Sequence, residues 1–196
     1  MRKVIYSMTV SLDGFIAARD GDIGWSAPDA ELHRFHNDRV RQVGVQLCGR
    51  ALYETMLFWE APEDTFSAPE AVEFAEIWKS VPKVVFSTTL QSTQGNATLA
   101  TGDVPEVVGK LKQEAGGDIA VGGAGLASAL IRLDLVDEYL LFVIPVVLGG
   151  GTPYFPALDR SLELELLETR TFRSPALYLR YARARASTGA SAASAT

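Results

Sequence analysis

Residues 119–126 read Ile-Ala-Val-Gly-Gly-Ala-Gly-Leu, and this stretch indicates the fold of the chain most clearly. Three apolar residues run directly into glycines and then into an amphipathic segment, which predicts a short buried strand, a tight turn and a helix. Glycines let a ligand approach the backbone, and the free N–H groups at a helix N-terminus attract a phosphate or pyrophosphate. The spacing differs from Gly-x-Gly-x-x-Gly and lacks the lysine of a Walker loop, so a tight turn without a ligand is the alternative.

The same alternation of short apolar runs and amphipathic segments continues on both sides of this stretch. It is typical of an α/β protein with a mostly parallel sheet. Strands are predicted at residues 4–11, 45–48, 83–87, 119–121 and 139–147. Helices are predicted at residues 28–43, 50–58, 69–78, 104–115 and 125–133, with Ser26 as the N-cap of the first. Segments 163–172 and 176–184 predict a closing antiparallel hairpin.

The length and composition predict a single globular domain. The chain has 196 residues, of which 47% are hydrophobic and 21% charged, and no linker divides its interior. We expect one domain over residues 1–184 and a mobile tail of small residues over 185–196. No secretory signal and no apolar run of about 20 residues is present, so we expect a cytoplasmic protein without a membrane span.

The charge balance opposes binding to nucleic acid. The formal net charge is −6 and the pI is about 5.0, whereas a nucleic-acid backbone attracts a basic surface. An acidic protein still binds a small anion where backbone N–H groups and one or two cations are placed to receive it. The composition therefore favours a small-molecule ligand.

Two further strand ends carry groups suited to an anion. Gly49 and Arg50 follow the second predicted strand, and Ser87 and Thr88 follow the third. Ligands of open α/β sheets bind outside the carboxyl ends of the strands, so we expect these groups near the glycine turn. Taken singly, Arg50 also fits a solvated arginine in a first helical turn, and the hydroxyls fit turn formers.

Other polar residues allow more than one interpretation. The glycine-containing connection 12–25 is long enough to be a binding loop, in which Asp13 and Trp25 would serve either a ligand or simply a turn and packing. Glu31, at the start of the first helix, fits a half-buried proton relay or an acid stabilised by the helix dipole. His33 and His36 are three residues apart, but neither His-Glu-x-x-His nor a cysteine cluster is present, and we expect no metal.

Several motifs follow one another along the chain: Ser11-Leu12-Asp13-Gly14, Trp25, Gly49-Arg50, Ser87-Thr88, Gly122-Gly123-Ala124-Gly125-Leu126, Leu133-x-Leu135-Val136-Asp137-Glu138 and Pro145-Val146-Val147-Leu148-Gly149-Gly150-Gly151. In this order they resemble the dihydrofolate reductase superfamily and, within it, the branch that includes the reductase domain of the riboflavin-biosynthesis deaminase/reductase. The similarity spans residues 2–182.

The resemblance implies a three-layer fold and an NADPH-dependent reductase that passes hydride to a C=N or C=O carbon of a pterin-like or pyrimidine-like heterocycle. On this pattern the cofactor would contact Thr9, Ile16, Ala17, Gly49, Arg50, Ser87, Thr88, Gly122, Gly123, Ala124, Gly125 and Leu126. Glu31 would be catalytic and would raise the proton affinity of the substrate. Asp13, Trp25, Phe35 and Tyr154 would bind the substrate, with Phe58 and Trp59 completing an aromatic pocket.

The chain also departs from the pattern of these families. Val81 stands where folate reductases hold the folate tail with an arginine, and Phe142 replaces the threonine that supports the buried carboxylate. Met56-Leu57-Phe58-Trp59-Glu60 stands where the riboflavin enzymes bind ribose phosphate. We therefore expect a stand-alone reductase similar to 5-amino-6-(5-phosphoribosylamino)uracil reductase or dihydrofolate reductase, and a homodimer through the 163–184 hairpin. The alternative is an inactive NADP-binding module that senses or sequesters a ligand.

Overall fold

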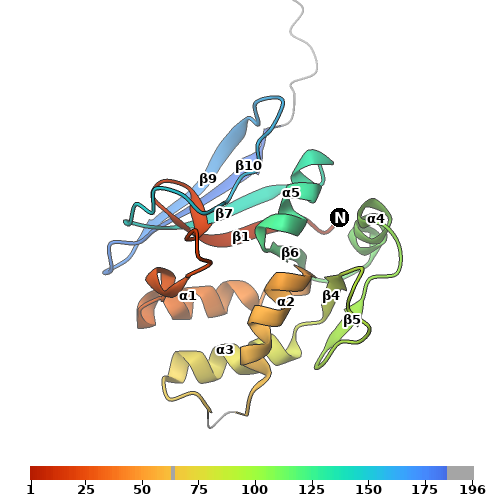
Figure 1. The fold of residues 1–196 in the computed structure, drawn as a ribbon, viewed down its shortest axis with the longest axis horizontal. Helices are drawn as coiled ribbons and strands as arrows, with labels where there is room; N and C mark the ends of the chain where they lie inside the picture. Colours follow the sequence, from red (N-terminus) through yellow and green to blue (C-terminus); the bar gives the residue numbers. More distant parts are fainter. Residues whose placement is uncertain (63–64, 185–196) are drawn as a thin grey trace, which may run out of the picture.

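A mostly parallel sheet forms the centre of the molecule, as the sequence predicts (Figure 1). The computed structural model describes residues 1–62 and 65–184, so the predicted tail at 185–196 lies outside the described residues. In sheet order the strands are β5 (Ala97–Leu99), β4 (Lys83–Phe86), β3 (Val43–Gly49), β6 (Asp118–Gly122), β1 (Val4–Ser11), β7 (Glu138–Ile144), β10 (Leu177–Arg183) and β9 (Leu164–Thr171). Neighbours from β5 to β7 are parallel, and β10 runs antiparallel to β7 and β9. The fold class and the closing hairpin are confirmed.

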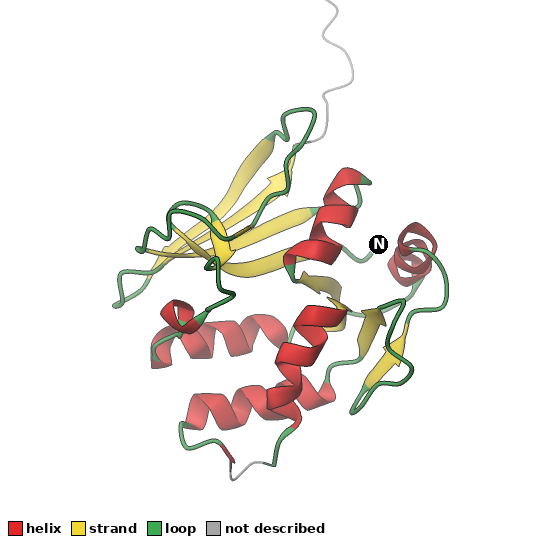
Figure 2. Cartoon of the chain, viewed as in Figure 1, coloured by secondary structure: helices red, strands yellow, loops and turns green. Residues whose placement is uncertain are grey.

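Helices cover both faces of this sheet (Figure 2). They are α1 (Ala30–Val40), α2 (Arg50–Met56), α3 (Pro69–Ser80), α4 (Val104–Gln113) and α5 (Ala124–Arg132), with 3-10 turns η1 (Gly24–Ser26) and η2 (Leu57–Glu60). Among the helices in the described ranges, none is long and apolar enough to cross a membrane.

The first helix is shorter than the sequence predicts. Asp29, not Ser26, is its N-cap, because the Asp29 carboxylate accepts the N–H of Leu32 at 2.8 Å. Ser26 lies in η1, where its hydroxyl donates to the carbonyl of Ile23. Strand β7 likewise ends at Ile144, because Pro145 has no N–H to donate to the ladder.

Alternate residues of β1 face different layers. Val4, Tyr6 and Val10 pack in a core that also contains Leu126 and Leu130 of α5. The intervening side chains point to the face covered by α1 and α3, where Ile5 packs in a second cluster with Leu32. The molecule therefore has three layers, with α5 on one side of the sheet and α1 and α3 on the other (Figure 1).

A second, two-stranded sheet was not predicted. β2 (Phe15–Ala17) pairs with β8 (Thr152–Pro153) and ties the connection 12–25 to the segment after β7. Strands of two or three residues carry too short an alternation to be recognised in a sequence, and the same applies to β5. This small sheet positions the loop that borders the candidate site.

Tyr154 occupies the core and not a ligand pocket, which differs from the prediction. Its ring stacks on Tyr6 at 4.2 Å between centroids, and its hydroxyl donates to the carbonyls of Tyr6 at 3.0 Å and Leu140 at 3.3 Å. Burial raises the pKa of the Tyr154 hydroxyl well above its ordinary value. The hydroxyl of Tyr6 is also buried, but it has no hydrogen-bond partner among the described residues.

These stacked tyrosines give a matched test of the core. We expect Tyr154→Phe to lower the free energy of unfolding by about 1 kcal/mol, because the buried hydroxyl loses its carbonyl partners. Tyr6→Phe removes an unpartnered hydroxyl and is expected to leave stability unchanged or slightly raised. Urea unfolding of the two variants measures the difference, and equal losses would contradict the hydrogen-bond assignment.

Candidate active site

Three strand ends meet at one edge of the sheet. The register pairs Gly49 at the end of β3 with Phe86 at the end of β4, and Cys48 of β3 with Gly122 at the end of β6. The strands β4, β3 and β6 are parallel neighbours, so the segments that follow them leave the sheet side by side. The structure thus brings together the three junctions that the sequence singled out.

Arg50 links two of these junctions. Its guanidinium donates to the hydroxyl of Thr89 at 2.8 Å and to the carboxylate of Glu54 at 2.7 Å. The hydroxyl of Ser87 accepts the N–H groups of Thr89 and Leu90 and so shapes the turn after β4. The Arg50 side chain is about half exposed, which leaves the cation accessible to an anion at this edge.

The glycine turn after β6 presents backbone donors to the same edge. Gly123 has a φ of +83°, a conformation that favours glycine, and it is the N-cap of α5. The first-turn N–H groups of α5 have no carbonyl partner within the helix. A side chain at Gly125 would meet no atom within 4 Å, so Gly125 faces open space. Backbone donors, a cation and hydroxyls at one edge fit the phosphates of a dinucleotide.

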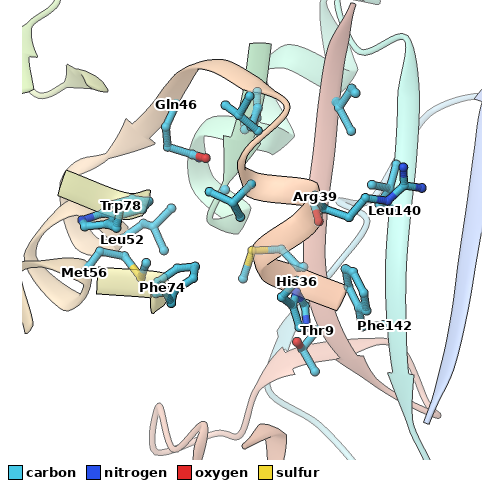
Figure 3. A pocket seen from close by; sticks show the side chains of 18 of the residues that line it. Thr9, His36, Arg39, Gln46, Leu52, Met56, Phe74, Trp78, Leu140 and Phe142 are labelled. Atoms are coloured by element: carbon cyan, nitrogen blue, oxygen red, sulfur yellow. The ribbon is translucent and has the colours of Figure 1, made fainter. Parts of the chain in front are cut away.

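A cavity of about 340 Å³ opens beside this edge and extends between α1, α3 and the sheet (Figure 3). Thr9 and Ile16 line it, as do Ile23 and Ser26 from the loop before α1. Gly122 also lines the cavity, so the glycine turn and the cavity share a wall. A Cβ at Gly122 would lie 2.5 Å from the side chain of Leu52, another lining residue, so a larger residue there would displace the Leu52 methyl group.

His36 lines the cavity, whereas in the sequence it stands out only as a candidate metal ligand. Its imidazole packs 3.8 Å from the Phe142 ring, between centroids, and lies near Thr9 (Figure 3). Burial, together with the nearby His33, lowers the pKa of His36 to about 4, so the imidazole is neutral at pH 7. Within the described ranges, no group of three or more histidine, cysteine or acidic side chains could hold a metal ion. The available signal for His36 was its position one turn after the apolar Leu32.

Glu31 does not line the cavity, in contrast to the catalytic role expected from the sequence. Its carboxylate accepts the backbone N–H of Arg173 at 3.0 Å and lies 3.9 Å from the guanidinium of Arg170. The reason is geometric: Glu31 is five residues before His36 on the helix, so the two side chains point in different directions. Glu31 therefore joins α1 to the turn between β9 and β10.

Asp13 holds two loops together. Its carboxylate accepts the hydroxyl of Ser11 at 2.7 Å and the N–H groups of Leu148 at 3.1 Å and Gly149 at 2.7 Å. The Ser11 hydrogen bond, supported by these N–H groups, lowers the pKa of Asp13 although desolvation opposes the shift. The carboxylate proposed for substrate binding is thus engaged with the backbone of the protein.

The predicted aromatic residues do not form one pocket. Phe35 packs with Phe172 and Tyr178 at 5.4 and 5.0 Å between ring centroids, while Trp59 stacks on Phe66 at 5.1 Å. The indole N–H of Trp25 donates to the carbonyl of Asp22 at 3.2 Å, and its neighbours Ile23 and Ser26 line the cavity instead. These aromatic residues look alike in the sequence, but they lie on different faces of their helices and strands and therefore pack in different places.

Residues 2–178 match the model of the RibD C-terminal domain family. The chain belongs to this family. It is 34% identical over 184 residues to the uncharacterised protein YyaP of Bacillus subtilis, a match that covers 92% of this chain and 94% of the relative.

Solved structures share the fold of this RibD C-terminal domain protein. A putative riboflavin biosynthesis protein from Shewanella sp. PV-4 superposes with a TM-score of 0.75 at 23% identity, covering 94% of this chain and all of that one. The dihydrofolate reductase of Enterococcus faecalis superposes with a TM-score of 0.59 at 16% identity, covering 92% and 96%. The dihydrofolate-reductase-like fold expected from the sequence is confirmed.

The Asp13 contacts in this RibD C-terminal domain protein predict a local effect. We expect Asp13→Asn to speed hydrogen exchange at the amides of Leu148 and Gly149, because a neutral amide is a weaker acceptor than a carboxylate. The pKa of Asp13 is lowered, so the carboxylate contacts persist below the ordinary pKa of an aspartate and are lost as the pH falls through the folded value. Asp159→Asn, at an exposed position, is the control. Unchanged exchange in Asp13→Asn would show that the loops are held by β2 and β8 alone.

The buried His36 predicts a pH dependence of stability. Its pKa is about 4 in the folded protein, compared with an ordinary value of 6.5, so between these values the unfolded chain binds more protons. The contribution of the neutral His36 to the free energy of unfolding is therefore fully present above pH 6.5, and it is lost as the pH is lowered toward 4. We expect His36→Phe to lose this part of the pH dependence, measured by urea unfolding across the range, and His33→Phe to retain most of it. An unchanged profile in His36→Phe would contradict the burial of the neutral imidazole.

Proposed function

We propose that this protein is an NADPH-dependent reductase that transfers hydride to a C=N or C=O carbon of a pterin-like or pyrimidine-like heterocycle. The observation that carries the proposal is that the anion-binding edge and the cavity meet at Gly122. A dinucleotide with its phosphates at this edge has its reactive ring directed toward the cavity. The riboflavin-biosynthesis and dihydrofolate reductase names of the structural neighbours support the same reaction class.

Each part of the site has a role in this proposal. Gly49, Arg50, Ser87 and Thr88 bind the 2′-phosphate side of the cofactor, and the glycine turn 122–126 holds the pyrophosphate. Thr9, Ile16 and Ala17 border the nicotinamide, which supplies the hydride when the cofactor is bound. The small β2–β8 sheet and the Asp13 contacts hold the loop that shields this region from water.

A second candidate is a module that binds NADP and a ligand without turnover. It is favoured by one observation: among the described residues that line the cavity, Asp118 is the only carboxylate, and it accepts the backbone N–H of Lys3 at 2.9 Å. In a reductase with this arrangement, a group other than Glu31 would supply the proton to the substrate. The homodimer and the cytoplasmic location stay predictions, the former supported by the exposed Leu166 and Leu167 on β9.

The cofactor assignment is tested by titration with NADPH and NADH, followed by calorimetry. We expect tighter binding of NADPH, and we expect Arg50→Ala to weaken it about tenfold with little change for NADH, because the charge-assisted hydrogen bonds to the 2′-phosphate are lost. Arg160→Ala, at another exposed arginine that is paired with Asp134, is the control. Failure of the unaltered protein to bind either nucleotide would overturn the proposed function. Equal NADPH affinity in Arg50→Ala would remove Arg50 from the site.

A further inference from the structure

The cavity continues along β1 away from Thr9 and Ile16, two of the residues assigned to the nicotinamide in the proposed function. Thr9, Ser7 and Ile5 of β1 all line it, and because they alternate along one strand the cavity follows the sheet for roughly 13 Å. Most of its other walls are apolar or aromatic side chains: Val40, Val43, Leu52, Met56, Phe74, Trp78, Leu140 and Phe142 (Figure 3). A ligand that extends along this cavity replaces water at a mainly apolar surface.

The cations in the cavity wall are already neutralised. Arg39 is 2.9 Å from the carboxylate of Glu168, and Arg180 is 2.8 Å from the carboxylate of the buried Glu138. Burial alone would raise the pKa of Glu138, but its hydrogen bonds to Arg180 and Lys3 lower it overall. Asp118 adds a further negative charge to the same wall. A phosphate placed in this cavity would lose its hydration and compete with Glu168 and Glu138 for these two guanidinium groups, which is costly. Arg50 is also paired, with Glu54, but it lies at an exposed edge where a phosphate keeps part of its hydration.

Apart from Arg39, whose buried Nε has no hydrogen-bond partner among the described residues, the polar groups that remain are neutral. The imidazole of His36 lines the cavity, and a neutral imidazole carries one donor and one acceptor. The amide of Gln46 also lines the cavity, and its nitrogen donates a hydrogen bond to the Leu47 carbonyl at 3.1 Å. Apolar walls with a few neutral donors and acceptors suit an uncharged ring with a polar edge.

We propose that this cavity is the substrate compartment, and that it takes an uncharged, mainly apolar ring compound without a phosphate group, with the polar edge of the compound on His36. The inference rests on the proposed function in that it names the substrate class of the same site. It excludes ribose-phosphate pyrimidines as ligands of the cavity. The single arginine assigned to phosphate binding, Arg50, serves the cofactor at the strand edge and does not line the cavity.

The proposal is tested by comparing naphthol with naphthyl phosphate, two probes that share the same two-ring body and differ in the phosphate. Binding to the full chain is measured by calorimetry, both with and without saturating NADPH. We expect naphthol to bind at least about tenfold more tightly than naphthyl phosphate in both conditions. Equal binding, or tighter binding of the phosphate, would overturn the proposal. If the protein does not bind NADPH, the proposed function is overturned. The comparison of naphthol with naphthyl phosphate can still be made without NADPH.

Two substitutions locate the probe in the cavity. Val40→Phe fills the space beneath α1 and is expected to weaken naphthol binding about tenfold or more, whereas Val107→Phe on α4 makes the same change outside the cavity. His36→Phe keeps an aromatic ring but removes the hydrogen-bonding nitrogens, and we expect a threefold to tenfold loss, roughly the effect of one neutral hydrogen bond. NADPH affinity is expected to stay unchanged in all three variants. Naphthol binding that is insensitive to both Val40→Phe and His36→Phe would place the probe elsewhere and contradict the proposal.

Discussion

The parallel hydrogen-bond register of β4, β3 and β6 is the constraint on which the rest of the site depends. Parallel neighbours end at the same edge of a sheet, so groups far apart in the chain become adjacent there. Arg50, the hydroxyls after β4 and the glycine turn before α5 share an edge for this reason. A shift in register would separate Arg50 from Thr89 and leave each junction an ordinary turn.

The face of the sheet opposite α5 contains the cavity. There the side chains of α1 and α3 stand away from the strands enough to leave a cavity, whereas the α5 face is filled by a continuous apolar core. The cavity is bounded by neutralised charges at Arg39 and Arg180 and by uncharged polar groups at His36 and Gln46. The α5 face is therefore densely packed, whereas the opposite face combines apolar clusters with a cavity.

Local patterns predicted the elements well where the pattern was long. The eight-residue β1 was predicted with its observed bounds, because alternation over that length is distinctive. The N-terminus of α1 was misplaced because both Ser26 and Asp29 are good N-caps, and only the geometry of the preceding η1 turn decides between them. β2, β5 and β8 are too short to leave a periodic signal.

By itself the sequence determined the α/β class, the mostly parallel sheet, the hairpin and the residues of the strand-end edge, since these follow from periodicity and from glycines next to strands. The tertiary structure alone decided which side chains face the cavity. A helix presents residues to different neighbours every 100° or so of rotation, and that rotation is set by packing. For this reason Glu31 lies against the hairpin, His36 faces the cavity, and Tyr154 belongs to the core.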